Sequence, residues 1–129
     1  MIRKIGLLVI REGRVLLCRK RYGTSLLILP GGKPEDGESE EETLRREIRE
    51  ELDTLAGTLN WFGLYEDEAA GDPRRVQISL YRGELADEPV ASNEIAELVW
   101  FGAQDDLHRL SPSLRNQIIP DLIQRGILR

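Results

Sequence analysis

Residues 30–54 read PGGKPEDGESEEETLRREIREELDT, in which a glycine-rich segment precedes one dense in acidic side chains. Ser39 stands three positions before Glu42, the spacing of a capping box, in which each side chain hydrogen-bonds the other residue's backbone N–H. This spacing predicts a helix that begins directly after Ser39. The acidic segment is therefore expected to be helical from its first residue.

The expected helix carries a cluster of carboxylates beside its apolar side. At about 100° per residue, Glu47, Glu50 and Glu51 fall in one sector. They border an apolar stripe that we expect to be buried, formed by Leu44, Ile48 and Leu52. Like charges this close repel each other, and more strongly where water is scarce. A divalent cation would reverse that repulsion, and hard oxygen ligands suit Mg²⁺ or Mn²⁺. Taken alone, the cluster also fits a solvated, charge-rich helix.

The preceding loop favours the metal-binding interpretation. With the helix it follows the pattern G-x5-E-x7-R-E-U-x-E-E-x-G-U, where U is a bulky apolar residue. The stretch resembles the signature box of the Nudix hydrolases, here residues 32–54. The matching positions are Gly32, Glu38, Arg46, Glu47, Ile48, Glu50 and Glu51. The last two positions depart, with Asp53 in place of glycine and Thr54 in place of an apolar residue. Asp can adopt the positive φ that glycine supplies at a helix end.

The fold expected is α/β, and residues 1–129 are expected to form one Nudix hydrolase domain. The patterns predict a C-terminal helix over 113–125, interrupted at Pro120. Apolar runs and alternation predict strands at 5–10, 15–18, 25–29, 57–65, 75–83 and 98–101. Such an order favours a mixed β-sheet covered by helices on both faces. The resemblance implies the same arrangement, an α/β/α sandwich.

Charge and cysteine content narrow the range of partners and compartments. The chain has a net charge of −5. Ten acidic and three basic side chains between Glu35 and Asp53 give that segment −7, which leaves the remainder at +2. This balance argues against a nucleic-acid polymer as partner. No apolar run approaches the roughly 20 residues of a membrane span. With Cys18 as the single cysteine and no visible signal peptide, a cytoplasmic location is expected.

The resemblance also implies a set of metal ligands and catalytic groups. Mg²⁺, which Mn²⁺ can replace, is expected to be held by Glu47, Glu50 and Glu51. The carbonyl of Gly31 and the carboxylate of Glu94 are expected to complete its shell, with Glu97 as the alternative to Glu94. The catalytic set is then Glu50, Glu94 and Arg46. Glu50 or Glu94 acts as the base for water, and Arg46 orients the carboxylates without reacting.

Two further roles in the box are expected to be structural, and three basic residues are candidates for the substrate phosphates. Gly32 permits a close backbone approach, and Glu38 ties the loop to the helix. The second strand ends in Arg19-Lys20-Arg21, where alternation places Arg19 and Arg21 on one face. These two side chains and Lys33 are the candidate phosphate contacts; the alternative is that they are only solvated.

The function expected is Mg²⁺-dependent hydrolysis of the pyrophosphate linkage of a nucleoside diphosphate derivative. A nucleoside triphosphate, oxidised or not, is the first candidate, giving a monophosphate and pyrophosphate. CTP, a dinucleoside polyphosphate or a nucleotide sugar stays open as substrate. So do a non-catalytic nucleotide-binding domain and a protein-interaction domain with a solvated acidic helix. Many members of the family are dimers, and the sequence leaves a homodimer open.

Overall fold

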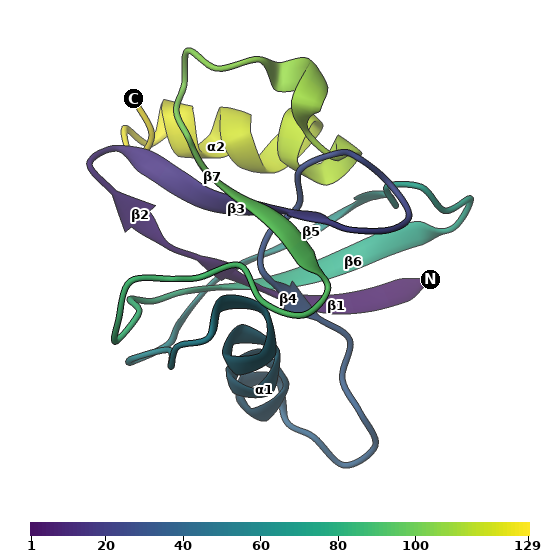
Figure 1. Cartoon of the computed structure of the whole chain (residues 1–129). Coiled ribbons are helices and arrows are strands. Elements are labelled where there is room, and N and C mark those ends of the chain that lie inside the picture. The colour runs from purple at the N-terminus through teal and green to yellow at the C-terminus, as the bar shows by residue number, and fades with distance from the viewer.

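The computed structural model describes residues 1–129, which form two β-sheets between two helical layers (Figure 1). Helix α1 covers one side, and the C-terminal helical segment covers the other. The strands are β1 (Ile2–Leu8), β2 (Ile10–Arg11), β3 (Arg14–Lys20), β4 (Gly31–Gly32), β5 (Asn60–Glu68), β6 (Arg75–Arg82) and β7 (Ile95–Phe101). The helices are α1 (Glu40–Leu52) and α2 (Ile119–Gln124), with a 3-10 turn at Leu107–Arg109 and a π-helical turn at Leu114–Ile118.

The first sheet is mixed and has the strand order β4-β1-β6-β5. Strands β1 and β6 are parallel, and the other pairs are antiparallel. The second sheet is antiparallel, with the order β2-β3-β7. The predicted α/β/α sandwich is thus confirmed, with two sheets in its middle layer where one was expected.

Helix α1 begins and ends as the sequence predicts. The Ser39 hydroxyl accepts from the Glu42 backbone N–H at 3.1 Å, and the Glu42 carboxylate accepts from that of Ser39 at 2.9 Å. Asp53 follows the helix with φ of 52°, in the left-handed region. Asp53 therefore does take the conformation that the glycine of the box supplies.

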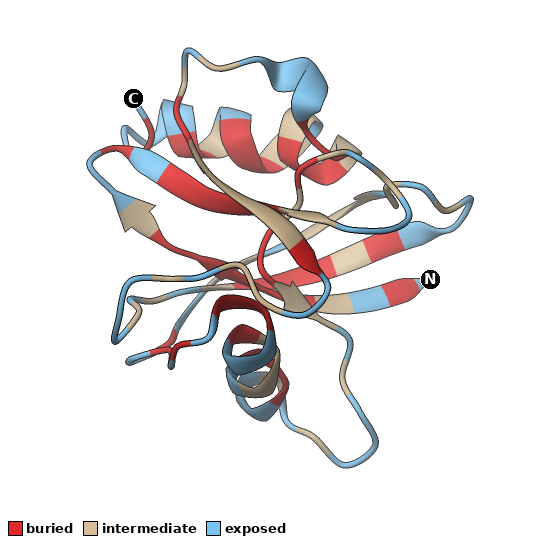
Figure 2. Ribbon diagram, in the orientation of Figure 1, coloured by how far each residue is buried: buried red, intermediate tan, exposed pale blue.

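Buried residues lie on the strands and on the inward sides of the helices (Figure 2). Leu44, Ile48 and Leu52 of α1 are fully buried and pack in one cluster with Ile5 and Leu7 of β1. Full burial of such a side chain contributes roughly 1.5–3 kcal/mol. This packing fixes the rotation of α1, so its carboxylate sector must face the edge of the first sheet.

One predicted strand is absent, and one predicted helix is irregular. Residues 25–29 form no strand, and only two isolated bridges, Cys18 with Ile28 and Leu27 with Leu110, join them to neighbours. The predicted C-terminal helix is present but irregular, because the π-helical turn at Leu114–Ile118 runs without a break into α2. Pro120 has no N–H to donate to the preceding turn, so this irregularity lies where the sequence predicted an interruption.

Candidate active site

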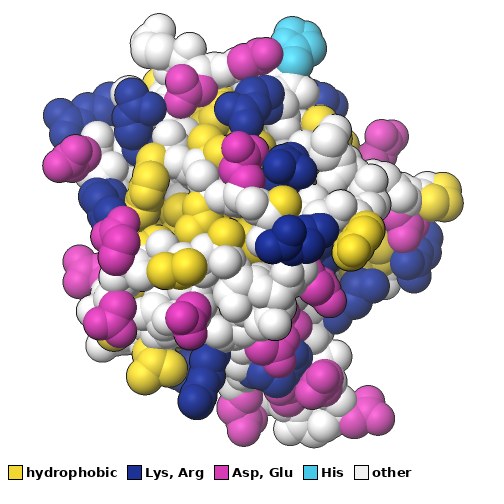
Figure 3. Space-filling view, viewed as in Figure 1, with side chains coloured by type: hydrophobic (Ala, Val, Ile, Leu, Met, Phe, Trp, Pro, Cys, Tyr) yellow, Lys and Arg dark blue, Asp and Glu magenta, His cyan; other side chains and the backbone are white.

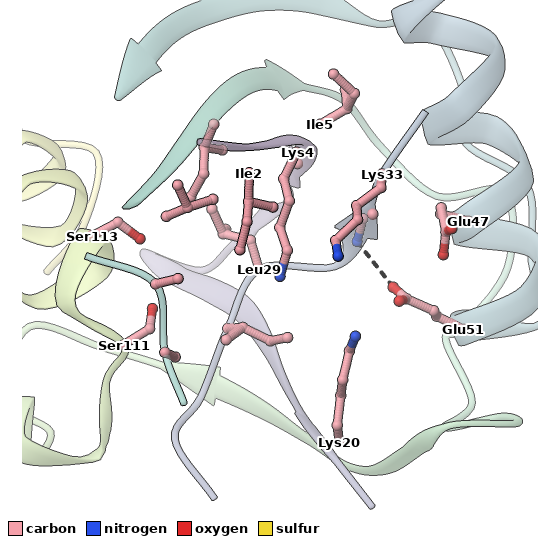
Figure 4. A pocket seen from close by; sticks show the side chains of 18 of the residues that line it. Ile2, Lys4, Ile5, Lys20, Leu29, Lys33, Glu47, Glu51, Ser111 and Ser113 are labelled. Carbon is pink, nitrogen blue, oxygen red and sulfur yellow. Dashed lines mark hydrogen bonds between the residues drawn. The ribbon is translucent and has the colours of Figure 1, made fainter. Parts of the chain in front are cut away.

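A cavity of about 370 Å³ opens beside α1 and continues towards the C-terminal helical segment. Its two ends differ in chemistry (Figure 4). At one end lie carboxylates of α1 and the glycines of β4; at the other, apolar side chains of β1 and β6 lie near Ser111 and Ser113. Acidic side chains are also numerous on the surface around α1 (Figure 3). The box is therefore one wall of this cavity.

Glu51 is the most buried of the acidic side chains in the cavity, with 6% of its surface exposed. It accepts a hydrogen bond from the Gly31 backbone N–H at 2.9 Å. Burial raises the pKa of Glu51 to about 8, and the negative charges of Glu47 and Glu94 add to this rise. A carboxylate this unfavourably placed is one that a bound cation would stabilise.

The other three carboxylates of the predicted set also line the cavity. Glu47 accepts a hydrogen bond from Arg46 Nη1 at 2.8 Å, yet burial still raises its pKa. Glu50 is about half exposed, and Glu94 is exposed in the loop before β7. The alternative to Glu94 lies elsewhere, because Glu97 pairs with Arg19 at 3.2 Å and is not part of the lining.

Arg46 and Glu38 hold the loop and the helix together below these carboxylates. Arg46 Nε and Nη2 donate to the two oxygens of Glu38 at 2.7 and 2.9 Å. The Arg46 hydrogen bond is the main reason that the pKa of Glu38 falls to about 2. Glu38 also accepts from the Glu35 backbone N–H and the Thr43 hydroxyl. Arg46 does not line the cavity, so it is a positioning residue that fixes Glu47.

Gly31 and Gly32 form β4, a two-residue strand paired with Ile5 and Gly6 of β1. Gly31 has φ of 142°, and a Cβ there would overlap the carbonyl oxygen of Ile5. A Cβ at Gly32 would lie 2.5 Å from Cδ of Glu47. Position 31 thus needs glycine because of its backbone conformation and the nearby backbone of β1. Position 32 needs glycine because the carboxylate of Glu47 packs directly on it.

Lysines, and not the predicted arginines, supply the positive charge of the cavity. Lys4, Lys20 and Lys33 line it near Glu51 (Figure 4), whereas Arg19 and Arg21 do not. Burial lowers the pKa of Lys4, and the charges of Lys20 and Lys33 lower it further.

Arg19 and Arg21 were chosen because alternation places them on one face of the second strand. Arg19 lies opposite Glu97 of β7 and pairs with it outside the cavity, whereas Lys20, on the other face of β3, lines the cavity. Arg21 holds the loop before β7. Its backbone N–H donates to the Glu94 carbonyl at 2.8 Å, and its Nε donates to the Asn93 carbonyl at 2.9 Å.

The residues present suit a hard divalent cation, although the structure contains no ready-made cluster. No three His, Cys, Asp or Glu side chains lie close enough together to hold an ion as they stand. The donors that line this end are carboxylates, which Mg²⁺ prefers. Burial, and after it the charges of Glu47 and Glu94, raise the pKa of Glu51, and a bound cation would offset both effects. The metal would therefore draw Glu47, Glu50, Glu51 and Glu94 together.

Comparison with known proteins identifies the protein family. Residues 2–122 match the NUDIX domain family. The chain belongs to the Nudix family, as its sandwich fold and its box indicate.

One curated relative carries an activity in its name. The oxidized purine nucleoside triphosphate hydrolase of Danio rerio is 33% identical over 97 residues, which are 73% of this chain. The chain spans 62% of that relative's length.

Solved structures share the fold. The E. coli ORF135 protein is 26% identical with a TM-score of 0.77, over 98% of this chain and 91% of that one. The MutT NUDIX hydrolase of Burkholderia pseudomallei is 25% identical with a TM-score of 0.68, over 78% and 81%. The NUDIX hydrolase of Nitrosomonas europaea, 20% identical with a TM-score of 0.78 over 98% and 90%, supports the fold alone. Separately, none of the helices has the length and apolar character needed to span a membrane.

Proposed function

We propose that this protein is a Mg²⁺-dependent pyrophosphohydrolase of nucleoside triphosphates, with oxidised purine nucleoside triphosphates as the foremost substrates. It would release a nucleoside monophosphate and pyrophosphate. The observation that carries the proposal is the composition of one cavity. Four carboxylates meet three lysines at one end, and the other end is largely apolar. None of the three lysines forms an ion pair within the protein. The first end suits a metal-bound polyphosphate and the second a nucleobase.

Each residue at the polar end has a role in this proposal. Glu47, Glu50, Glu51 and Glu94, with the carbonyl of Gly31, would hold the metal. When bound, Mg²⁺ supplies positive charge that neutralises the pyrophosphate and acidifies water. Glu50 or Glu94, the two exposed carboxylates, would accept the proton of the attacking water, because a general base needs access to it.

Two of the lysines would contact the phosphates. The ammonium groups of Lys20 and Lys33, which lie beside Glu51, can donate to phosphate oxygens, and such charged hydrogen bonds are stronger than neutral ones. They would stabilise the leaving pyrophosphate electrostatically. The preference for an oxidised purine rests on the named activity of the Danio rerio relative.

A substrate panel tests the proposal. The protein would be incubated with ordinary and oxidised nucleoside triphosphates, a dinucleoside polyphosphate and a nucleotide sugar, with Mg²⁺ or with EDTA. Pyrophosphate and phosphate would be measured separately. We expect pyrophosphate release that EDTA abolishes, with the highest kcat/KM for an oxidised purine. Thermal stabilisation by nucleotide with no product formed would instead identify a nucleotide-binding domain.

Lys20 gives a second test. Lys20→Met is expected to lower kcat/KM for a nucleoside triphosphate by about ten- to a hundredfold, the worth of one hydrogen bond to a charged group. Arg19→Met is the matched control, because Arg19 adjoins Lys20 but pairs with Glu97 outside the cavity. It should stay within about twofold of the wild type. Steady-state kinetics measures both, and a larger loss for Arg19→Met would contradict the assignment.

A further inference from the structure

Two serine hydroxyls at the apolar end of the cavity have no partner in the protein. Ser111 and Ser113 are 5% and 3% exposed, and both line the cavity. Figure 4 shows both hydroxyls in the cavity, without a hydrogen bond to any residue drawn. No sealed polar side-chain atom in the structure lacks a partner. The two unpaired oxygens must therefore reach the open space of the cavity.

The backbone around these serines is fixed. The Ser111 N–H donates to the Leu27 carbonyl at 3.0 Å, and its carbonyl accepts from Arg115 at 2.9 Å. Ser113 has helical φ and ψ of −62° and −39° just before the π-helical turn, and its side chain caps no backbone N–H there. Neither hydroxyl stabilises the fold by a hydrogen bond, and the fixed backbone leaves both available to a bound ligand.

The rest of this end is apolar or already neutralised. Ile2, Leu29, Val76 and Ile78 supply flat apolar walls. Asp72 also lines the cavity, but Arg74 holds it at 2.7 Å, and Glu68 is exposed. The two serines thus offer a ligand uncommitted hydroxyls in a small and largely apolar compartment.

Lys4 determines which ligand groups such a compartment favours. Its side chain enters the cavity from β1, between the serines and Glu51 in the view of Figure 4, and makes no ion pair. An ammonium group donates hydrogen bonds and accepts none, and each hydroxyl has one proton to donate. The hydroxyls can also accept a hydrogen bond, so the charge of Lys4 decides between ligand groups: it favours a carbonyl oxygen over an amino group, whose own protons would face the charge.

We propose that Ser111 and Ser113, together with Lys4, are specificity-determining residues that recognise exocyclic oxo groups of the nucleobase. This inference rests on the proposed function, and it deepens it by giving a chemical class of base. Bases with a carbonyl at the recognised edge are accepted, and their amino counterparts are disfavoured. An additional oxo group on a purine supplies a further acceptor for the same donors.

The test compares inosine and adenosine triphosphates, which differ in having an oxo or an amino group at one ring position. Wild-type protein should hydrolyse the inosine compound with the higher kcat/KM. The double variant Ser111→Ala/Ser113→Ala should lower that value about tenfold through KM, and change the adenosine value by no more than about twofold. Ser25→Ala, at an exposed position outside the cavity, is the matched control and should alter neither.

Two further measurements separate the possible results. The melting temperature of the double variant should not fall, because the hydroxyls it removes have no partner in the free protein. An equal loss for both triphosphates would overturn the inference. If the wild type hydrolyses neither, the proposed function fails, and calorimetric binding of inosine and adenosine monophosphates tests the serines alone. If the wild type prefers the inosine compound and the double variant does not, the role of the serines is supported. If the double variant keeps that preference, or the wild type has none, the inference is overturned.

Discussion

Glu51→Gln is expected to lower Mg²⁺-dependent kcat by more than about 100-fold, because even partners of metal ligands typically contribute ten- to a hundredfold. Glu51 is the buried carboxylate at the closed end of the cavity, fixed by the Gly31 N–H at 2.9 Å. Glutamine keeps the shape of the side chain but brings no negative charge to a cation. Initial rates of pyrophosphate release over a range of Mg²⁺ concentrations measure the effect.

The control for this variant is Glu41→Gln, which removes an exposed carboxylate of the same helix. It should leave the rate within about twofold of the wild type, because an exposed charge is screened by salt. Wild-type turnover by Glu51→Gln at saturating Mg²⁺ would contradict the assignment of Glu51 as a metal ligand.

The Glu51→Gln substitution should also make the metal-free protein more stable at alkaline pH. The pKa of Glu51 is about 8 in the folded protein, against a usual value of 4.5. Between these pH values the folded state binds more protons than the unfolded state, so the free energy of unfolding falls as the pH rises. Urea unfolding in EDTA at pH 5 and pH 8 should show this fall in the wild type and a smaller one in Glu51→Gln. Equal falls in the two proteins would mean that Glu51 is not the group responsible.

Gly31→Ala is expected to reduce the free energy of unfolding by about 3 kcal/mol or more. Two penalties combine at this position. The φ of 142° is one that alanine rarely adopts, and the new Cβ would overlap the backbone of Ile5 in β1. A flexible side chain could move aside, but the carbonyl of a paired, buried strand cannot. Urea denaturation in EDTA measures the change.

Gly37→Ala separates the two penalties. Gly37 lies in the same loop with φ of 82°, and a Cβ there would meet nothing within 4 Å. The Gly37→Ala variant should lose only the part of the free energy of unfolding that comes from the positive φ, about 1–2 kcal/mol. If both variants lost the same amount, the close approach of Gly31 to β1 would not be what requires glycine.

The helix and its carboxylates could be predicted because their determinants are local. The capping box of Ser39 and Glu42 depends on residues three apart, and the buried stripe on the helical repeat. The left-handed conformation of Asp53 follows from the same local geometry. The family resemblance then added Gly31 and Glu94, and both line the cavity.

The contacts missed from sequence depend on pairing between distant segments. Which face of β3 meets the cavity depends on its pairing with β7, some 75 residues further along the chain. Strand β4 exists only because Gly31 and Gly32 pair with β1. Ser111 and Ser113 show no motif, and only the bridge between Leu27 and Leu110 brings their segment to the cavity. Lys4 was missed because the first strand was expected to begin at Ile5, whereas it begins at Ile2.

The two ends of the cavity come from different parts of the chain. Gly31 to Glu51 supply most of the hydrolytic end, and β1, β6 and the segment around Ser111 supply the other. Under the proposed function, mutation at the second end would change which substrate is selected without disturbing the residues that cut it. A lineage of such proteins could acquire new preferences by drift at a few distal positions, and an engineer could seek altered selectivity in a library restricted to them.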